Sequence, residues 1–344
     1  MVYLECDYNN GCHPAVLEKL TQTNDAPQLG YGFDEYSESA KQKIKEACGR
    51  PEADVFFLVG GTQTNATVLS SVLKPHEGVV AVDSGHIGGH ECGAVEYTGH
   101  KVMTIPGENG KLPASALKNY LSAFYGDANY DHMVFPGAVY VSFPTELGTL
   151  YSRQELQSLH EVCKEYSTPL YVDGARLGYG LSSYACDFTL SDLCGLCDIF
   201  YIGGTKVGAL CGEAVVFPNG DAPAHFFSMI KQHGALLAKG RLAGVQFDAL
   251  FTDGLYFSIS RHAIEMAEKL KQIIRDCHID FWLETPTNQQ FIILDDDFVK
   301  RLDPFVANGF WEKYDETRTV VRFCTSWATT DEQLNELAKY LKTV

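Results

Sequence analysis

The chain has 344 residues, of which 45% are hydrophobic and 21% charged, a composition typical of a soluble globular protein with a substantial core. Its formal net charge is −17, which excludes a surface that attracts nucleic acid or an anionic membrane as a whole. No apolar run approaches membrane-spanning length, and Met1–Glu5 lacks the pattern of a secretory signal. We therefore expect a cytoplasmic protein in which any anionic ligand meets a local cationic site.

The eleven cysteines are odd in number and irregularly spaced, which predicts free thiols in a reducing compartment. Cys194 and Cys197 form the one C-x-x-C pair, and a zinc site of that kind needs a second pair. His86, His90 and Glu91 invite a metal interpretation, but two glycines between the histidines disfavour the helix that a zinc peptidase uses. We therefore expect no metal.

In chain order, the first twenty residues mix turn formers and predict an arm rather than a domain. A helix is expected from Ser37 to Cys48. The apolar run Val55–Val59 predicts a buried strand, which leads through Gly60-Gly61-Thr62 into a helix. The free N–H groups at such a helix start form an anion site, although an ordinary N-cap produces the same pattern. No G-x-G-x-x-G motif or P-loop lysine supports a nucleotide.

Strands then alternate with helices, which predicts a mostly parallel sheet between helices. The expected strands are Val79–Asp83, Lys101–Ile105, Ala138–Ser142, Leu170–Val172, Ile199–Ile202 and Glu213–Phe217. The expected helices are Ser115–Phe124 and one that a Ser152–Glu155 capping box starts and that reaches about Glu165.

After Pro223 the pattern changes to long helical stretches, among them Ser258–Cys277. Strands at Phe291–Leu294 and Thr319–Cys324 and a final helix capped at Thr330 follow. We therefore predict an α/β fold with a large domain over residues 21–255. A smaller α/β domain would combine the N-terminal arm, residues 1–20, with residues 256–344.

Three functional side chains are expected at the carboxyl ends of neighbouring strands, where open α/β sheets bind ligands. One strand opens into Gly203-Gly204-Thr205-Lys206, and another ends in Asp173-Gly174-Ala175-Arg176. Pyridoxal phosphate suits such a set, because its aldehyde condenses with a lysine and a carboxylate keeps its pyridine nitrogen protonated. A solvated lysine and a surface ion pair would leave the same residues. His86, at another strand end, could stack on the ring or bind a neighbouring loop.

Together these motifs resemble the low-specificity threonine aldolases, pyridoxal-phosphate enzymes of fold type I, nearly end to end. The segment Gly61-Thr62-Gln63-x-Asn65 is similar to the family's phosphate-holding turn, and His86 falls on the histidine that stacks on the ring. The resemblance implies that Asp173 meets the ring nitrogen and Arg176 the region of the ring oxygen. Lys206 falls on the lysine that binds the cofactor covalently, and Thr205 stands where many members have serine.

The same resemblance extends to the substrate and to a partner subunit. Arg322 matches the arginine that binds the substrate carboxylate, and Cys6 stands where well-known members have a serine that contacts the same group. Arg241 matches an arginine that reaches the phosphate region near a subunit interface, and Tyr31 matches a position near a partner's active site. Glu146 replaces a histidine assigned to the substrate hydroxyl.

The resemblance thus implies a homo-oligomer, a dimer or dimer of dimers, that binds pyridoxal 5'-phosphate and a small amino-acid substrate. Its reaction would be the retro-aldol cleavage of L-threonine or L-allo-threonine to glycine and an aldehyde, with Lys206, His86 and Glu146 as catalytic residues. Two alternatives stay open. One is a β-eliminating lyase or aminotransferase on the same fold, and the other is a catalytically silent binding protein.

Overall fold

The computed structural model describes residues 1–343, which contain a seven-stranded, a four-stranded and a two-stranded sheet. The seven-stranded sheet runs in the order β2 (Asp54–Leu58), β8 (Glu213–Phe217), β7 (Ile199–Gly203), β6 (Leu170–Asp173), β5 (Phe135–Ser142), β3 (Glu77–Val82) and β4 (Val102–Ile105). Strands β3 to β7 are mutually parallel, whereas β8 is antiparallel to both β7 and β2. The predicted mostly parallel sheet is therefore confirmed.

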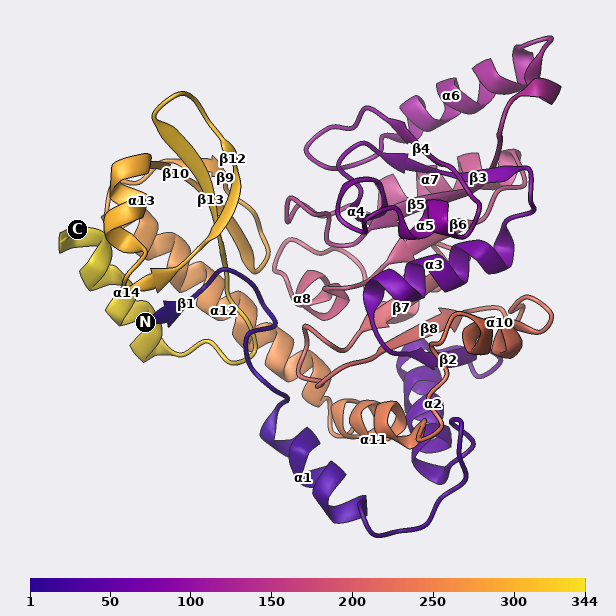
Figure 1. Ribbon diagram of the computed structural model, residues 1–344, viewed down its shortest axis with the longest axis horizontal. Coiled ribbons are helices and arrows are strands. Elements are labelled where there is room, and N and C mark those ends of the chain that lie inside the picture. The colour runs from indigo at the N-terminus through magenta and orange to yellow at the C-terminus, as the bar shows by residue number, and fades with distance from the viewer. Residues whose placement is uncertain (344) are drawn as a thin grey trace.

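Helices cover both faces of this sheet, so its strands are apolar on both sides (Figure 1). Along β3, Val80 and Val82 belong to one core, while Val79 and Ala81 belong to the other. The first core is covered by α2 (Glu35–Cys48), α6 (Ala114–Gly126), α7 (Arg153–Glu165), α8 (Leu177–Leu181), α9 (Leu190–Leu193) and α11 (Arg241–Leu250). The second is covered by α3 (Gly61–Val72), α5 (Ala94–Tyr97) and α10 (Phe226–Gln232).

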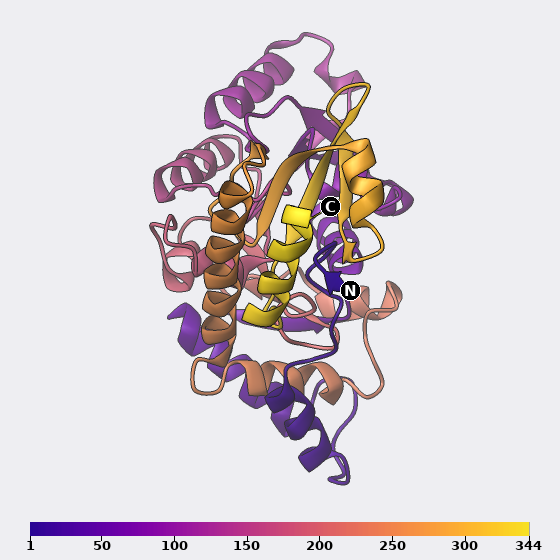
Figure 2. The same ribbon diagram turned by 90° about the vertical axis from the view of Figure 1, so that its left-hand side faces the viewer.

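The 22-residue helix α12 (Leu255–Asp276) connects this part of the molecule to the small four-stranded sheet (Figure 2). Its first half contributes Ile259 and Ile264 to the core of the large sheet, and its second half contributes Leu270 and Ile274 to the core of the small one. Because one helix belongs to both cores, it marks no single boundary residue. The expected division at residues 20 and 255 stays a prediction.

The small sheet is antiparallel and carries one wall of the site described below. Its strands run in the order β12 (Gly309–Lys313), β13 (Arg318–Cys324), β10 (Gln289–Asp295) and β9 (Phe281–Leu283), with α13 (Asp296–Leu302) and α14 (Asp331–Thr343) nearby. The first strand of the chain, β1 (Val2–Tyr3), pairs with β11 (Val306–Ala307) and lies beside α14, as both views show (Figures 1 and 2).

The N-terminal segment contains more regular structure than an arm. Helix α1 (Pro14–Thr23) begins within residues 1–20, because Pro14 occupies the first helical position and His13 Nδ1 accepts a hydrogen bond from Ala15 N. The short helix α4 (His86–Gly89) follows β3. The expected Ser152 capping box is present, with both of its hydrogen bonds formed. Among residues 1–343, no helix is long and apolar enough to cross a membrane.

Candidate active site

Two adjoining cavities lie at the carboxyl ends of the parallel strands. The first, which we call the strand-end cavity, is lined by eight of the residues predicted from the sequence: Gly61, Thr62, His86, Glu146, Asp173, Arg176, Thr205 and Lys206. The second, which we call the inter-sheet cavity, shares His86, Glu146, Arg176 and Lys206 with it and extends to Arg322 and Trp311 of the small sheet. Nine of the residues predicted from the sequence therefore line one or both of two adjoining cavities.

Asp173, the last residue of β6, is buried and has a full set of hydrogen-bond donors. Tyr201 and Ala175 N donate to Oδ1 over 2.6 and 2.9 Å, while Tyr140 and Asn65 donate to Oδ2 over 2.7 and 2.9 Å. Burial opposes ionisation, but the nearby His86 and these donors lower the pKa of Asp173 below its ordinary value. Asp173 is therefore held as a carboxylate, the form that can face a protonated ring nitrogen.

His86 projects from the start of α4 and is oriented by a buried carboxylate. Its Nδ1 lies 2.7 Å from Glu91 Oε1, which also accepts a hydrogen bond from Asn65 Nδ2 over 2.7 Å. Burial would lower the pKa of His86, but the hydrogen bond to Glu91 and the charge of Asp173 raise it on balance. Glu91, considered above only as a possible metal ligand, thus fixes the imidazole over the cavity.

Lys206 follows β7 through two glycines that permit a close approach of backbones. A Cβ on Gly203 would lie 2.3 Å from Ala175 O, so only glycine allows the end of β7 to meet the turn after Asp173. Burial, and after it the charge of Arg176, lowers the pKa of Lys206. A lowered pKa increases the fraction of neutral amine, which is the nucleophilic form.

Thr205, beside this lysine, is engaged within the strand-end turn. Its Oγ1 donates to Glu213 Oε1 over 2.8 Å and accepts from Gly212 N over 3.1 Å. Burial raises the pKa of Glu213 to about 8. Thr205 therefore lines the cavity while helping to hold the turn that carries Lys206.

Arg176 forms a two-pronged ion pair with Asp7 from the N-terminal segment. The distances are 2.6 Å from Nε to Oδ2 and 3.0 Å from Nη2 to Oδ1. Burial would raise the pKa of Asp7, but Arg176 and Lys206 lower it to about 2. The sequence placed an Asp173–Arg176 pair here as one possibility, and the structure gives Arg176 a different partner.

Glu146 follows β5 and has one carboxyl oxygen with hydrogen-bond donors and one without. Its Oε1 accepts hydrogen bonds from Ser142 Oγ over 2.5 Å and from His86 N over 3.0 Å. Its Oε2 is covered from bulk solvent and finds no hydrogen-bond partner within residues 1–343. Burial raises the pKa of Glu146, and the charge of Asp173 adds to the rise against the opposing hydrogen bond from Ser142. A raised pKa makes this carboxylate a better base.

Arg322, on β13, reaches the inter-sheet cavity from the opposite side. It donates to Gln289 Oε1 over 3.3 Å and to Glu5 O over 3.1 Å, while its buried Nε has no partner in the described part of the chain. The Trp311 ring lies 5.7 Å from its guanidinium carbon. Arg322 therefore retains a donor for an anionic group in the cavity.

Three predicted residues do not line either cavity in the described chain. Cys6 Sγ donates to Asn9 Oδ1 over 2.7 Å. Arg241 donates to the carbonyl oxygens of Thr23 and Ala26, and Tyr31 lines a separate apolar cavity. Their expected roles stay predictions.

The strand-end cavity fits pyridoxal phosphate in the chemistry of its donors. Helix α3 begins after Gly60, which has no side chain, so the backbone N–H groups of Gly61 and Thr62 at the cavity wall can bind a phosphate. Asp173 supplies the anion for the ring nitrogen, His86 an aromatic face, and Lys206 the amine.

Comparison with known proteins decides the family. The family model described as beta-eliminating lyase matches residues 13–297. The chain belongs to the beta-eliminating lyase family. Like the other enzymes of this family, it is a pyridoxal-phosphate-dependent lyase. The sequence resemblance to low-specificity threonine aldolases is thereby confirmed.

Among the proteins similar to this chain, a solved Leishmania major threonine aldolase is 39% identical, covers 99% of both chains and has a TM-score of 0.95. A low-specificity L-threonine aldolase from a Pseudomonas species is 27% identical over 98% of this chain and 96% of its own length. An aspartate aminotransferase from Thermus thermophilus, 14% identical over 99% of this chain and 91% of its own, has a TM-score of 0.72 and supports the fold alone.

Proposed function

We propose that this lyase cleaves L-threonine and L-allo-threonine, and 3-hydroxy amino acids like them, to glycine and an aldehyde. The observation that carries the proposal is that, among the described residues lining the inter-sheet cavity, Glu146 and Arg322 each have a buried atom without a partner, Oε2 and Nε. Both residues line the inter-sheet cavity together with Lys206. A base and a carboxylate-binding cation beside one lysine are the groups that this cleavage requires.

Pyridoxal phosphate, when bound, supplies an electron sink for the bonds to the substrate Cα. Gly61, Thr62, His86, Asp173 and Lys206 are the residues that would hold it. Arg322 binds the substrate carboxylate and thereby fixes which bond to Cα is aligned for cleavage. Glu146 takes the proton of the β-hydroxyl at Oε2, which drives Cα–Cβ cleavage and release of the aldehyde.

The test is a product assay with the purified holoenzyme on threonine, allo-threonine, serine and phenylserine. We expect glycine and the matching aldehyde. A keto acid with ammonia would instead identify a β-eliminating lyase, and a keto acid without ammonia an aminotransferase. Cofactor binding without any product would identify a silent binding protein.

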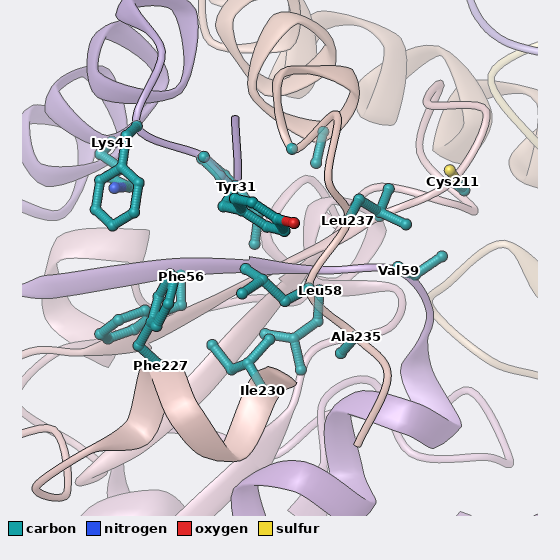
Figure 3. A pocket seen from close by; sticks show the side chains of 17 residues that line it. Tyr31, Lys41, Phe56, Leu58, Val59, Cys211, Phe227, Ile230, Ala235 and Leu237 are labelled. Carbon is teal, nitrogen blue, oxygen red and sulfur yellow. The ribbon is translucent and has the colours of Figure 1, made fainter. Parts of the chain in front are cut away.

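A homo-oligomer, with a dimer as its unit, is supported by an apolar cavity beside the strand-end cavity. Figure 3 shows Tyr31, Leu58, Phe227 and Leu237 around this cavity. Phe33, which also lines it, is 58% exposed, and Val59 and Cys211 line both this cavity and the strand-end cavity. Covering such a surface with a second copy would bury apolar area next to the active site.

Sedimentation of Phe33→Asp tests this assembly. We expect the variant to dissociate, because a charge in an apolar interface is costly. The matched control is Tyr97→Asp, at a side chain that is 94% exposed elsewhere on the surface. A wild-type protein that is fully active as a monomer would contradict the proposal.

A cytoplasmic location, also proposed, is supported by the eleven free cysteines.

A further inference from the structure

Two side chains, Ser142 and Tyr140, join Glu146 to Asp173 through consecutive hydrogen-bond contacts. Ser142 Oγ lies 2.5 Å from Glu146 Oε1 and 3.1 Å from the Tyr140 hydroxyl. The Tyr140 hydroxyl lies 2.7 Å from Asp173 Oδ2. Tyr140, Ser142 and Asp173 are at most 7% exposed, so these contacts are largely shielded from bulk solvent.

The number of hydrogens in this path is limited. Each hydroxyl donates one hydrogen and accepts through two lone pairs. Tyr140 donates to the ionised Asp173, so it can only accept from Ser142. The single hydrogen of Ser142 therefore goes either to Glu146 or to Tyr140, but not to both.

The protonation of Glu146 decides between these two arrangements. An ionised Glu146 attracts the Ser142 hydrogen, which leaves no hydrogen between Ser142 and Tyr140. A protonated Glu146 can itself donate to Ser142 once its acid hydrogen is on the oxygen that faces Ser142. Ser142 then donates to Tyr140, and Tyr140 to Asp173, so that every contact of the path contains a hydrogen.

We propose that Ser142 and Tyr140 couple Glu146 to Asp173, so that the two carboxylates bind one proton as a linked pair. Ser142 and Tyr140 are positioning residues, since they act through the carboxylates of Glu146 and Asp173. The proposal rests on the proposed function, in which Glu146 receives the substrate hydroxyl proton. That proton moves from the substrate oxygen to Glu146 Oε2, rotation of the neutral carboxyl group turns it towards Ser142, and the Ser142 hydrogen then reorients towards Tyr140, while no electron is gained or lost.

The coupling extends the influence of the substrate-facing base to Asp173, the carboxylate that would face the ring nitrogen of the cofactor. Buried carboxylates that interact strongly titrate as a pair rather than singly. Burial raises the pKa of Glu146 and the negative charge of Asp173 adds to that effect, as expected for such a pair. The other titratable or charged groups that face the path are His86, Glu91, Tyr151, Tyr171, Arg176, Tyr201, Lys206 and Glu213.

The experiment measures the pH profile of threonine cleavage and, separately, the pH titration of cofactor absorbance in the holoenzyme. Ser142→Ala removes the donor to ionised Glu146, so the acidic limb of kcat/KM should move to higher pH by about half a unit to one unit. Tyr140→Phe removes the hydroxyl that competes with Glu146 for the Ser142 hydrogen, which favours ionised Glu146. The acidic limb of kcat/KM should therefore move to lower pH. Ser142→Thr keeps the hydroxyl and should restore the wild-type limb.

The absorbance titration tests the coupling directly. Ser142→Ala leaves every hydrogen-bond donor to Asp173 in place. We nevertheless expect it to shift the pH midpoint of the cofactor absorbance. In the Ser142→Ala background, Tyr140→Phe should move the acidic limb no further. Equal shifts in both backgrounds, or an unmoved absorbance midpoint, would overturn the proposal.

Controls separate an effect of the Ser142–Tyr140 path from a general effect of removing a tyrosine hydroxyl, from misfolding and from failure of the proposed function. Tyr120→Phe changes a half-buried tyrosine outside this path, whose hydroxyl donates to Met103 Sδ over 3.5 Å, and should leave the limb and the midpoint unchanged. Thermal unfolding identifies any variant that fails to fold, in which case Ser142→Thr carries the comparison. If the wild type forms no glycine from threonine, the proposed function fails, while the absorbance titration still decides the coupling.

Discussion

Asp173 in the strand-end cavity and two residues of the inter-sheet cavity satisfy their polar groups very differently. Both oxygens of Asp173 accept two hydrogen bonds each. In the inter-sheet cavity, Arg322 Nε on the small sheet and Glu146 Oε2, just after β5 of the large sheet, are buried without partners among residues 1–343. A buried polar atom without a partner is costly, so such atoms are expected where a ligand supplies the partner. The comparison supports the proposed division into a preorganised cofactor side at Asp173 and a substrate side at Glu146 and Arg322.

The largest expected effect comes from the cofactor side. Lys206→Ala should remove the yellow cofactor band and reduce threonine cleavage below detection, because no other amine takes the place of Nζ. Borohydride treatment of the wild type should attach the cofactor to Lys206, as peptide mapping would show. Lys269→Ala, an exposed lysine paired with Asp331, serves as the control. A label on another lysine would refute the assignment.

Glu146→Gln tests the base on the substrate side. The amide keeps the size of the side chain and its contact with Ser142 but cannot accept the hydroxyl proton. We expect kcat to fall about 10²–10⁴-fold with the cofactor spectrum retained. Glu165→Gln, an exposed glutamate paired with Lys118, should behave as wild type. A near wild-type rate and pH profile would show that another group is the base.

Arg322→Lys removes the planar fork while keeping the charge. We expect kcat/KM for threonine to fall by an amount equal to about 2–5 kcal/mol, with an unaltered cofactor spectrum. The control is Arg318→Lys on the same strand, where the arginine pairs with exposed Asp315. Unchanged kinetics in Arg322→Lys would place the substrate carboxylate elsewhere.

The smallest effect concerns the join between the two sides, the Asp7–Arg176 pair. The pKa of Asp7 is lowered from 3.8 to about 2, so its ionisation stabilises the folded protein above pH 3.8, and this stability disappears as the pH falls through 2. The contribution is roughly 2 kcal/mol. Urea unfolding should therefore show a stability difference between wild type and Asp7→Asn that shrinks from pH 4 to pH 2. The exposed Asp25→Asn should show no such trend.

The two sides also differ in how well the sequence predicted them. Asp173 and Lys206 follow apolar strands whose ends are marked by glycines, so periodicity alone placed them together. Asp7, the partner of Arg176, lies 169 residues from it in the sequence. Asn288, which also donates a hydrogen bond to Asp7, lies 281 residues from Asp7. Such long-range pairs leave no local pattern.

The remaining differences have similar physical causes. Ser142 and Tyr140 were identified only as strand residues, because their role depends on the register of β5 with β6. Helix α1 was not predicted, because turn-forming residues directly precede Pro14, the first residue of the helix. Cys6, Tyr31 and Arg241 came from the family resemblance, and two of them depend on a second subunit for their expected role.

The pairing of β1 with β11 has a consequence for synthesis on the ribosome. Val2 meets Val306, and Leu4 O accepts a hydrogen bond from Cys324 N. Residues 2–4 therefore find their pairing partners only after residues 306–324 have been translated. Arg322 belongs to the same late segment. The large sheet can begin to fold during translation, but the substrate side can close only after β13 has left the ribosome.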